Sequence, residues 1–238
     1  MISVCMATFN GEKHIKEQIE SILSQLSFVD ELIVSDDGST DKTLDIIESF
    51  HDNRIRVLHH SPVEGSAFKK ATSNFENALR HAKGKYIFLS DQDDIWHKDK
   101  IEKCMKVLDK HLCVQHTRNC FADGANCIFP PNLRVANSLF ESILFLPSCF
   151  TGCCLAFNRK LLDIALPIPK SVNVHDGWIG CLAFMSKDLV ILNENLIDYR
   201  VNESTVSYGK SRNSLMKKIT YRLNIFVKVI MRFYFMNR

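Results

Sequence analysis

Several kinds of segment are missing from this 238-residue sequence, and each absence narrows what the chain can be. No charge-free apolar run is long enough to cross a bilayer, which argues against a membrane-spanning protein. Neither a basic segment nor a long apolar run precedes Asn10, so we expect no signal peptide. Glycine-rich phosphate loops of the G-x-G-x-x-G or G-x-x-x-x-G-K-[ST] type are also absent, which argues against a dinucleotide-binding or P-loop protein.

The nine cysteines include no C-x-x-C pair. Cys113, Cys120 and Cys127 are evenly spaced near His111 and His116, so a zinc site is one interpretation. Their spacing matches no common zinc pattern, however. Buried reduced thiols are the other interpretation, and they would indicate a cytosolic protein, because disulfides are rare in that compartment.

The formal net charge is only +3, but the charges are unevenly distributed. Eight Lys and Arg residues and no acid follow Ser204, whereas the first 203 residues carry 22 basic and 27 acidic residues. We therefore expect a mildly acidic domain over residues 1–205 and a basic tail over residues 206–238. An apolar content of 46% is sufficient for a packed core in the domain.

Apolar residues recur at helical spacing in the tail, at Leu215, Ile219, Leu223, Phe226, Ile230 and Phe233. With the basic residues between them, they predict a basic amphipathic helix over residues 211–238 that binds an anionic membrane surface. Packing of this helix on its own domain, or in a homodimer, is the alternative. We expect no nucleic-acid binding, because the rest of the chain offers no basic face.

Short apolar segments alternate with segments of helical periodicity from Met1 to Leu89. This alternation is typical of a parallel sheet with crossover helices. We expect strands at residues 1–7, 31–35, 54–58 and 86–89, and helices at 14–26, around 44–50 and at 68–81. Farther along, we expect helices at 98–112 and 177–185 and a strand at 189–192, whereas 113–147 shows little periodicity.

Three of the expected strands end in polar, mostly acidic clusters, namely Thr8-Phe9-Asn10, Asp36-Asp37-Gly38-Ser39 and Asp91-Gln92-Asp93. In a parallel sheet the ligand crevice lies beyond the carboxyl ends of the strands, so the clusters should converge there. Carboxylates this close together repel one another, so we expect a cation among them to offset the repulsion. Carboxylate oxygens are suitable ligands for Mg²⁺ or Mn²⁺. The alternative is that Asp93 or Asp94 only caps the next helix.

Three motifs, Met6-Ala7-Thr8-Phe9-Asn10-Gly11, Ser35-Asp36-Asp37-Gly38-Ser39-Thr40-Asp41 and Leu89-Ser90-Asp91-Gln92-Asp93-Asp94, resemble those of family-2 glycosyltransferases in order and spacing. The resemblance implies a GT-A fold of the α/β class, a mainly parallel sheet flanked by helices. It also implies a nucleotide-sugar-binding half over residues 1–97 and an acceptor half over 98–205. The variant with Gln92 and a following Ile95-Trp96 is similar to bacterial enzymes of surface-polysaccharide assembly, including rhamnosyltransferases.

The resemblance implies roles for individual residues. Asp93 would bind Mg²⁺ or Mn²⁺ and Asp91 the hydroxyls of the ribose or sugar. The other residues expected to bind the donor, a dTDP- or UDP-linked sugar, are Thr8, Phe9, Asn10, Glu12, Asp36, Asp37 and Gln92. Asp176 stands at the position of the general base, with a helix N-cap as its structural alternative. Tyr199-Arg200 resembles a Tyr-Arg-x-His segment whose histidine is missing here, which leaves a third metal ligand open.

The expected activity is inverting, metal-dependent transfer of a sugar to a hydroxyl of a glycan or lipid-linked acceptor. It would serve capsule or O-antigen type polysaccharide synthesis, with the protein peripheral on the inner face of the plasma membrane. A sugar nucleotidyltransferase is an alternative, but it would be expected to carry a glycine- and lysine-rich loop in place of Thr8–Glu12. A non-catalytic scaffold protein is the other alternative, and the presence of Asp91, Asp93 and Asp176 argues against it.

Overall fold

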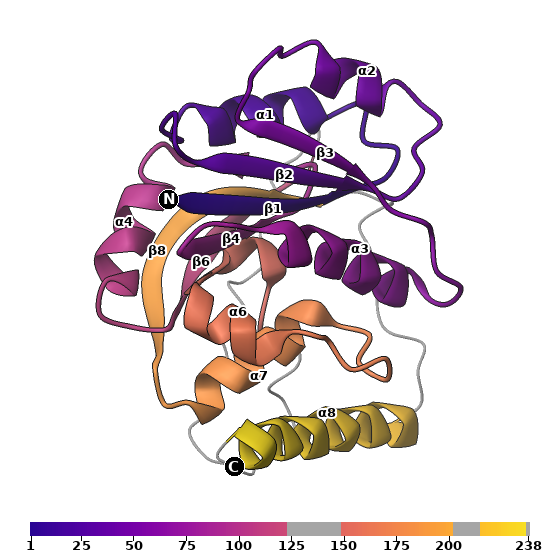
Figure 1. Cartoon of the computed structure of the whole chain (residues 1–238), viewed down its shortest axis with the longest axis vertical. Helices are drawn as coiled ribbons and strands as arrows, with labels where there is room; N and C mark the ends of the chain where they lie inside the picture. The colour runs from indigo at the N-terminus through magenta and orange to yellow at the C-terminus, as the bar shows by residue number, and fades with distance from the viewer. Residues whose placement is uncertain (123–148, 202–214, 237–238) are drawn as a thin grey trace.

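The computed structural model describes residues 1–122, 149–201 and 215–236 (Figure 1). An eight-stranded sheet in the order β3-β2-β1-β4-β7-β6-β8-β5 forms its centre. The first four strands in that order are mutually parallel, as the strand–helix alternation predicted. They are β3 (Ile55–His59), β2 (Glu31–Asp36), β1 (Ile2–Thr8) and β4 (Tyr86–Ser90). Their carboxyl ends therefore meet at one edge.

The second half of the sheet is mixed. Its strands are β7 (Leu155–Asn158), β6 (Cys113–Phe121), β8 (Leu189–Arg200) and β5 (Ile95–Trp96). Strand β7 runs antiparallel to β4 and β6, β6 is parallel to β8, and β5 is antiparallel to β8. Strand β8 continues well beyond the expected residues 189–192. The sequence of β6 shows no apolar alternation, because buried polar side chains such as Gln115 and His116 occupy it, and sequence patterns therefore missed it.

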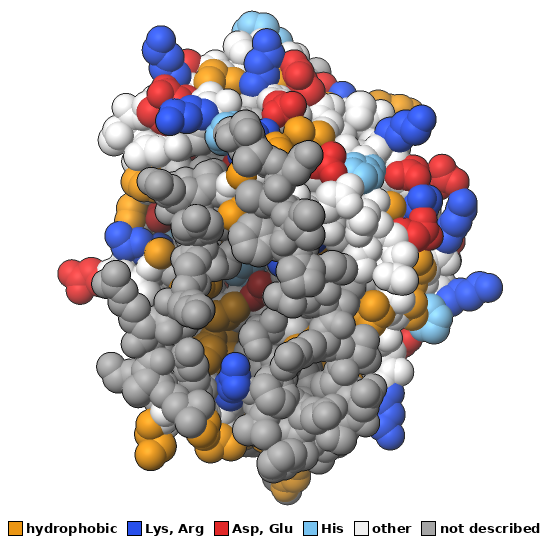
Figure 2. All heavy atoms as spheres, turned by 180° about the vertical axis from the view of Figure 1, so that it is seen from behind, with side chains coloured by type: hydrophobic (Ala, Val, Ile, Leu, Met, Phe, Trp, Pro, Cys, Tyr) orange, Lys and Arg blue, Asp and Glu red, His pale blue; other side chains and the backbone are white. Residues whose placement is uncertain are grey.

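Helices cover both faces of the sheet (Figure 1). On one face lie α1 (Ile15–Leu23), α2 (Thr43–Glu48) and α4 (Lys100–Leu108), the last shorter than the expected helix 98–112. On the other face lie α3 (Ala67–His81), α6 (Arg159–Ala165) and α7 (His175–Met185), and α8 (Leu215–Met236) packs outside α7. Acidic and basic side chains are interspersed at the upper end of the molecule in Figure 2, around α1 and α2.

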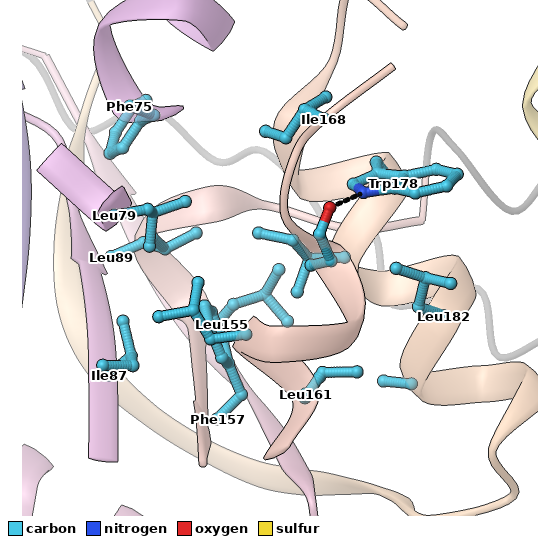
Figure 3. Packing of buried hydrophobic residues seen from close by; sticks show 14 of the residues in the cluster. Phe75, Leu79, Ile87, Leu89, Leu155, Phe157, Leu161, Ile168, Trp178 and Leu182 are labelled. Carbon is cyan, nitrogen blue, oxygen red and sulfur yellow. Dashed lines mark hydrogen bonds between the residues drawn. The ribbon is translucent and has the colours of Figure 1, made fainter. Parts of the chain in front are cut away.

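The alternation of side chains along each strand divides the core into two layers. In β1, Val4 and Met6 join the layer under α1 and α4, whereas Cys5 joins the layer under α3 and α6. The second layer is drawn in Figure 3, where Trp178 of α7 packs against the α6 segment and its indole Nε1 donates to the carbonyl of Ala165 at 2.9 Å. Helices thus cover both faces of the sheet. The edge formed by the carboxyl ends of its parallel strands remains for a site.

The described cysteines form no disulfide with one another and, except for Cys120, are buried, as the reduced-thiol interpretation predicted. Cys113 and Cys120 lie near opposite ends of β6, roughly 23 Å apart at about 3.3 Å per residue, so they cannot share one zinc ion. His111 is paired instead with Asp188, its Nδ1 2.7 Å from Oδ1. Cys127 lies outside the described residues.

Helix α8 packs on its own domain through one face, which confirms the packing alternative for that face. Ile225 and Val229 are buried in the layer that contains Trp178. Arg232 donates to the carbonyls of Ile164, Leu166 and Pro167 at 2.6–2.9 Å. Across the described residues, no helix combines the length and apolarity needed to cross a membrane.

Candidate active site

The side chain of Gln92 joins the loop after β4 to the loop after β1. Its Oε1 accepts from Thr8 Oγ1 at 2.6 Å and from the Phe9 amide at 2.8 Å, and its Nε2 donates to the Phe9 carbonyl at 3.1 Å. A Cβ at Gly11 would lie only 2.6 Å from Gln92 Oε1, so this close approach requires glycine there. The polar side-chain atoms of Gln92 therefore bond the loop after β1, and its expected contact with the donor stays a prediction.

Asn10 and Glu12 join the loop after β1 to the loop after β2. Asn10 Oδ1 accepts from the Thr40 amide at 2.9 Å, and Glu12 Oε2 accepts from the Lys42 amide at 3.1 Å. In return, the Asn10 amide donates to Ser39 Oγ at 2.8 Å. Asn10 adopts a φ of 49°, a left-handed conformation that asparagine tolerates well. These contacts fix the relative positions of the two loops.

The two neighbouring acids at the end of β2 have different hydrogen-bond partners. Asp36 is 1% exposed, and its carboxylate accepts from the amides of Gly38 and Ser39 and from Ser39 Oγ, which builds the turn. Asp37 instead pairs with His60, whose Nδ1 lies 2.7 Å from Asp37 Oδ1. The other ring nitrogen of His60 lies 3.1 Å from Ser73 Oγ on α3. No sequence motif had pointed to His60, which follows β3.

We expect His60→Phe to raise the KM for the nucleotide-sugar donor about tenfold while kcat stays close to the wild-type value. The reason is that the carboxylate of Asp37 loses its hydrogen bond with His60 and is no longer held in one orientation; a hydrogen bond to a charged group such as a carboxylate is worth about 1.5–3 kcal/mol. Steady-state kinetics with the donor varied would measure both constants, and Ser73→Ala should give a smaller rise in KM. An unchanged KM with a reduced kcat would contradict a role of this pair in donor binding.

The acids after β4 form a partly buried cluster. Burial, together with the charges of Asp93 and Asp176, raises the pKa of Asp91 to about 7. Burial and the charges of Asp91 and Asp93 raise the pKa of Asp94 well above its ordinary value. Asp94 Oδ1 accepts from the Arg200 amide at 3.0 Å, and Arg200 Nε donates to the Asp93 carbonyl at 2.8 Å. The Tyr-Arg segment therefore supports the acidic loop from β8.

This cluster fits a divalent cation. Ligand atoms of Asp91, Asp94 and Cys153 lie within 4.8 Å of one another, the one such group in the described part of the chain. Asp94 Oδ2 is buried and has no hydrogen-bond partner among the described residues. A bound cation would relieve the repulsion that raises the carboxyl pKa values. Asp93 is not a member of this group, so its assignment as the metal ligand stays a prediction.

Asp176 lies in the first turn of α7, near the acidic cluster. The N-cap of α7 is Val174, so the structural alternative, in which Asp176 is the N-cap, is wrong. Burial raises the pKa of Asp176 to about 7. The amides of Gly177, at 2.7 Å from Oδ1, and of Gly152 donate to its carboxylate and oppose that rise. A carboxylate of this kind changes protonation near neutral pH, as a general base requires.

Two neighbours hold the first turn of α7 in place. The ring of His175 stacks on Phe75 with centroids 4.0 Å apart, and its burial lowers its pKa to about 3, so the imidazole is neutral. A Cβ at Gly152 would lie 3.0 Å from His175 Nε2, so the loop before β7 approaches α7 closely at this glycine. These contacts hold the Asp176 side chain on the side of α7 that faces the segment beginning at Thr151.

A buried lysine links two segments near the acidic cluster. Lys100 of α4 is fully buried, and its Nζ donates to the carbonyl of Cys153 at 2.7 Å and lies 3.8 Å from the Trp96 ring centroid. It thus ties the segment after the acidic loop to the segment before β7. Sequence reasoning missed Lys100, because a lysine in an amphipathic helix is usually exposed.

Comparison with known proteins agrees with this arrangement. The family model described as "Glycosyl transferase family 2" matches residues 3–164, which include all three loops. The chain belongs to glycosyl transferase family 2. This confirms the resemblance carried by the three motifs, and it makes the chain an enzyme of the glycosyltransferase class.

Two curated glycosyltransferases illustrate the relationship. The dTDP-rhamnosyl transferase RfbG of Shigella flexneri is 32% identical over 164 residues, which cover 66% of this chain and 55% of RfbG. TuaG of Bacillus subtilis strain 168, a glycosyltransferase assigned to teichuronic acid biosynthesis, is 33% identical over 233 residues, which cover 93% of this chain and 87% of TuaG. The chain thus spans about half of RfbG and most of TuaG.

Solved glycosyltransferase structures share the fold. S. aureus TarS 1–349 in complex with UDP-GlcNAc aligns with a TM-score of 0.68 and 19% identity, over 97% of this chain and 72% of that one. Glucosyl-3-phosphoglycerate synthase of Mycobacterium tuberculosis, in complex with Mn²⁺, UDP and glucosyl-3-phosphoglycerate, aligns with a TM-score of 0.58 and 18% identity, over 98% of this chain and 79% of that one. The GT-A fold expected from the motifs is therefore confirmed.

Proposed function

We propose that this glycosyltransferase is an inverting, metal-dependent enzyme that transfers a sugar from a dTDP- or UDP-linked donor to an acceptor hydroxyl. The main support is that Asp176 and the acids after β4 lie close enough for the charge of Asp176 to raise the pKa of Asp91. A base and a donor-binding acid thus meet at one sheet edge. The relatives support the donor class, because RfbG is named as a dTDP-rhamnosyl transferase and TarS was solved with UDP-GlcNAc.

In the proposed reaction Asp176 takes the proton of the acceptor hydroxyl as its oxygen attacks the anomeric carbon opposite the diphosphate. Asp91 holds hydroxyls of the donor, and Asp37, oriented by His60, contacts the nucleoside. Thr8 and Phe9 are held against the donor side by Gln92. A divalent cation held by Asp93 and its neighbours would neutralise the charge of the departing diphosphate. The Mn²⁺ in the glucosyl-3-phosphoglycerate synthase complex supports Mn²⁺ or Mg²⁺ for this role.

A screen of nucleotide sugars with Mn²⁺ or Mg²⁺ would test this proposal. We expect release of UDP or dTDP from one donor, dependence on the cation, and inverted anomeric configuration in the product by NMR. Retention of configuration would exclude the single displacement through Asp176. Formation of pyrophosphate from a nucleoside triphosphate and a sugar phosphate would instead support the nucleotidyltransferase alternative.

The acceptor is, in this proposal, a glycan or lipid-linked intermediate of bacterial surface-polysaccharide synthesis. The assignment of TuaG to teichuronic acid biosynthesis supports it. We further propose that residues 1–205 form the catalytic domain, with the donor half in residues 1–97, and that residues 206–238 attach it to the inner face of the plasma membrane.

The outer face of α8 supports membrane attachment. The face opposite Ile225 and Val229 is apolar, and its exposed residues are Met216, Leu223, Val227, Ile230, Met231 and Tyr234. Hydrophobic side chains are visible at the lower edge of Figure 2, where α8 lies in Figure 1. The helix contains Lys and Arg but no acid, which suits an anionic lipid surface. Arg232, however, faces its own domain and is not available to lipid.

The double variant Val227→Glu with Ile230→Glu should abolish co-sedimentation with vesicles that contain anionic lipid, because two charges would enter the apolar boundary. Phe28→Glu with Val29→Glu is a matched control, since these residues are also exposed but lie between α1 and β2. The control should still bind. Equal binding by both variants would exclude α8 as the anchor, and a fall in molecular mass of the α8 variant alone would indicate a homodimer through this face.

A further inference from the structure

Arg118 of β6 is a partly buried cation that none of the sequence motifs includes. One of its terminal nitrogens donates to Thr151 Oγ1, and its guanidinium lies 4.7 Å from the ring centroid of Tyr199 on the neighbouring strand β8. The guanidinium is thus held from two sides, by the loop before β7 and by β8. A side chain fixed in this way can hold its neighbours in turn.

A short series of contacts leads from Arg118 to Asp176. Arg118 bonds Thr151, the next residue is Gly152, and the Gly152 amide donates to the Asp176 carboxylate. The space around Gly152 is tight, because a Cβ there would lie 3.0 Å from His175 Nε2 and 3.7 Å from Asp176 Cβ. If Thr151 moved, Gly152 and the Asp176 carboxylate would therefore have to move with it, because there is little free space between them.

Arg118 differs in charge from the other described ionisable groups around Asp176. Asp91, in the loop after β4, is a like charge near Asp176, and the charge of Asp176 raises the pKa of Asp91. Cys181 of α7 and Tyr221 of α8 are neutral because burial raises their pKa values, and burial keeps His175 neutral. Arg118 is the cation of this set, and its charge lowers the pKa of Asp176 against the effect of burial.

We propose that Arg118 is a positioning residue of the sugar transfer: its contact with Thr151 places the Asp176 carboxylate to accept the acceptor's proton, and its positive charge acts on that carboxylate. This rests on the proposed function of Asp176 as the base. In that step the acceptor O–H bond breaks and its proton goes to the Asp176 carboxylate. The acceptor oxygen forms the bond to the anomeric carbon, and the bond from that carbon to the diphosphate breaks, its electron pair leaving with the diphosphate.

Three variants separate the charge of Arg118 from its hydrogen bond. Arg118→Met removes both, Arg118→Lys keeps the charge, and Thr151→Val removes the hydroxyl while Arg118 remains. The measurement is kcat/KM for transfer between about pH 5 and about pH 9, with donor KM and nucleotide binding determined in parallel.

For Arg118→Met we expect the acid limb of the pH profile to move up by about one unit. Activity near pH 6 then falls about tenfold further than above about pH 8, where only the roughly threefold loss expected for Thr151→Val remains, with donor KM unchanged. Arg118→Lys should leave the limb where it is in the wild type. Thr151→Val should also leave the limb in place and lower kcat about threefold, because only the position of the base changes.

A loss of activity in Arg118→Met that is equal at all pH values would overturn the proposal, as would a raised donor KM, which would indicate a contact with the diphosphate. If Arg118→Met does not fold, a shifted limb in Arg118→Lys would overturn it in the same way. Failure of the proposed function would give a different result from failure of the Arg118 proposal. In that case wild-type protein would transfer no sugar, or Asp176→Asn would remain active.

Discussion

Replacing Asp176 with asparagine should lower the turnover of sugar transfer by about 10²–10⁴-fold, the usual contribution of a positioned general base. The amide oxygen of asparagine can still accept from the Gly177 amide, so the first turn of α7 should keep its conformation. In the wild type, turnover should rise with pH through about 7, because burial raises the pKa of Asp176 to about that value and only the ionised form accepts a proton. Rates of nucleotide release across pH would measure both effects.

Nucleotide binding distinguishes loss of the base from loss of the site. Asp176→Asn should bind UDP or dTDP with wild-type affinity in a calorimeter, and Asp45→Asn on the exposed surface of α2 should behave as wild type throughout. Wild-type turnover in Asp176→Asn would remove this residue from the mechanism. Loss of nucleotide binding would assign it to the donor side instead.

Replacing Asp93 with alanine should abolish the part of nucleotide binding that depends on Mn²⁺ and lower transfer by roughly 10²-fold or more. A metal ion that stabilises charge on a leaving group is worth several kcal/mol, and the variant should lose this contribution. The loop itself should remain in place, because Arg200 holds the main-chain carbonyl of residue 93, which no side-chain substitution removes. Calorimetric titration of nucleotide with and without Mn²⁺ would measure the effect.

The matched variant is Asp94→Asn, which changes the neighbouring acid. Asp94 lies with Asp91 and Cys153 in the group whose ligand atoms approach within 4.8 Å, and it also bonds the Arg200 amide. If Asp93 is the principal ligand, Asp94→Asn should keep most of the Mn²⁺ dependence. The opposite pattern, with Mn²⁺ dependence retained in Asp93→Ala and lost in Asp94→Asn, would place the ion in the buried group.

The location of the candidate site was predictable from the sequence, whereas the hydrogen-bond partners of several of its side chains were not. The three polar clusters do converge, because β1, β2 and β4 are adjacent parallel strands that end at one edge. The side chains of Gln92, Asn10 and Glu12 bond neighbouring loops, and their expected contacts with the donor stay predictions. A motif names residue types at a spacing, and it does not show which polar atoms are already used by the protein.

Residues that act through long-range contacts left no signal in the sequence. Arg118 and His60 lie outside every motif. His60 bonds Asp37 directly, whereas Arg118 bonds Thr151, which precedes the glycine whose amide donates to Asp176. Lys100 occupies a helix position whose burial depends on strands and loops that come later. For such residues the local pattern is the same whether the side chain is exposed or buried.

From its residues alone, the chain could be assigned a parallel first half and a cluster of acids beyond the strand ends. These follow from the period of the apolar residues and from turn chemistry, which act over a few neighbouring residues. The mixed second half of the sheet, the docking of α8 through Ile225 and Val229, and the approach of Arg118 to Asp176 required the folded chain. They depend on how distant segments pack together, and packing is a property of the whole core rather than of any one segment.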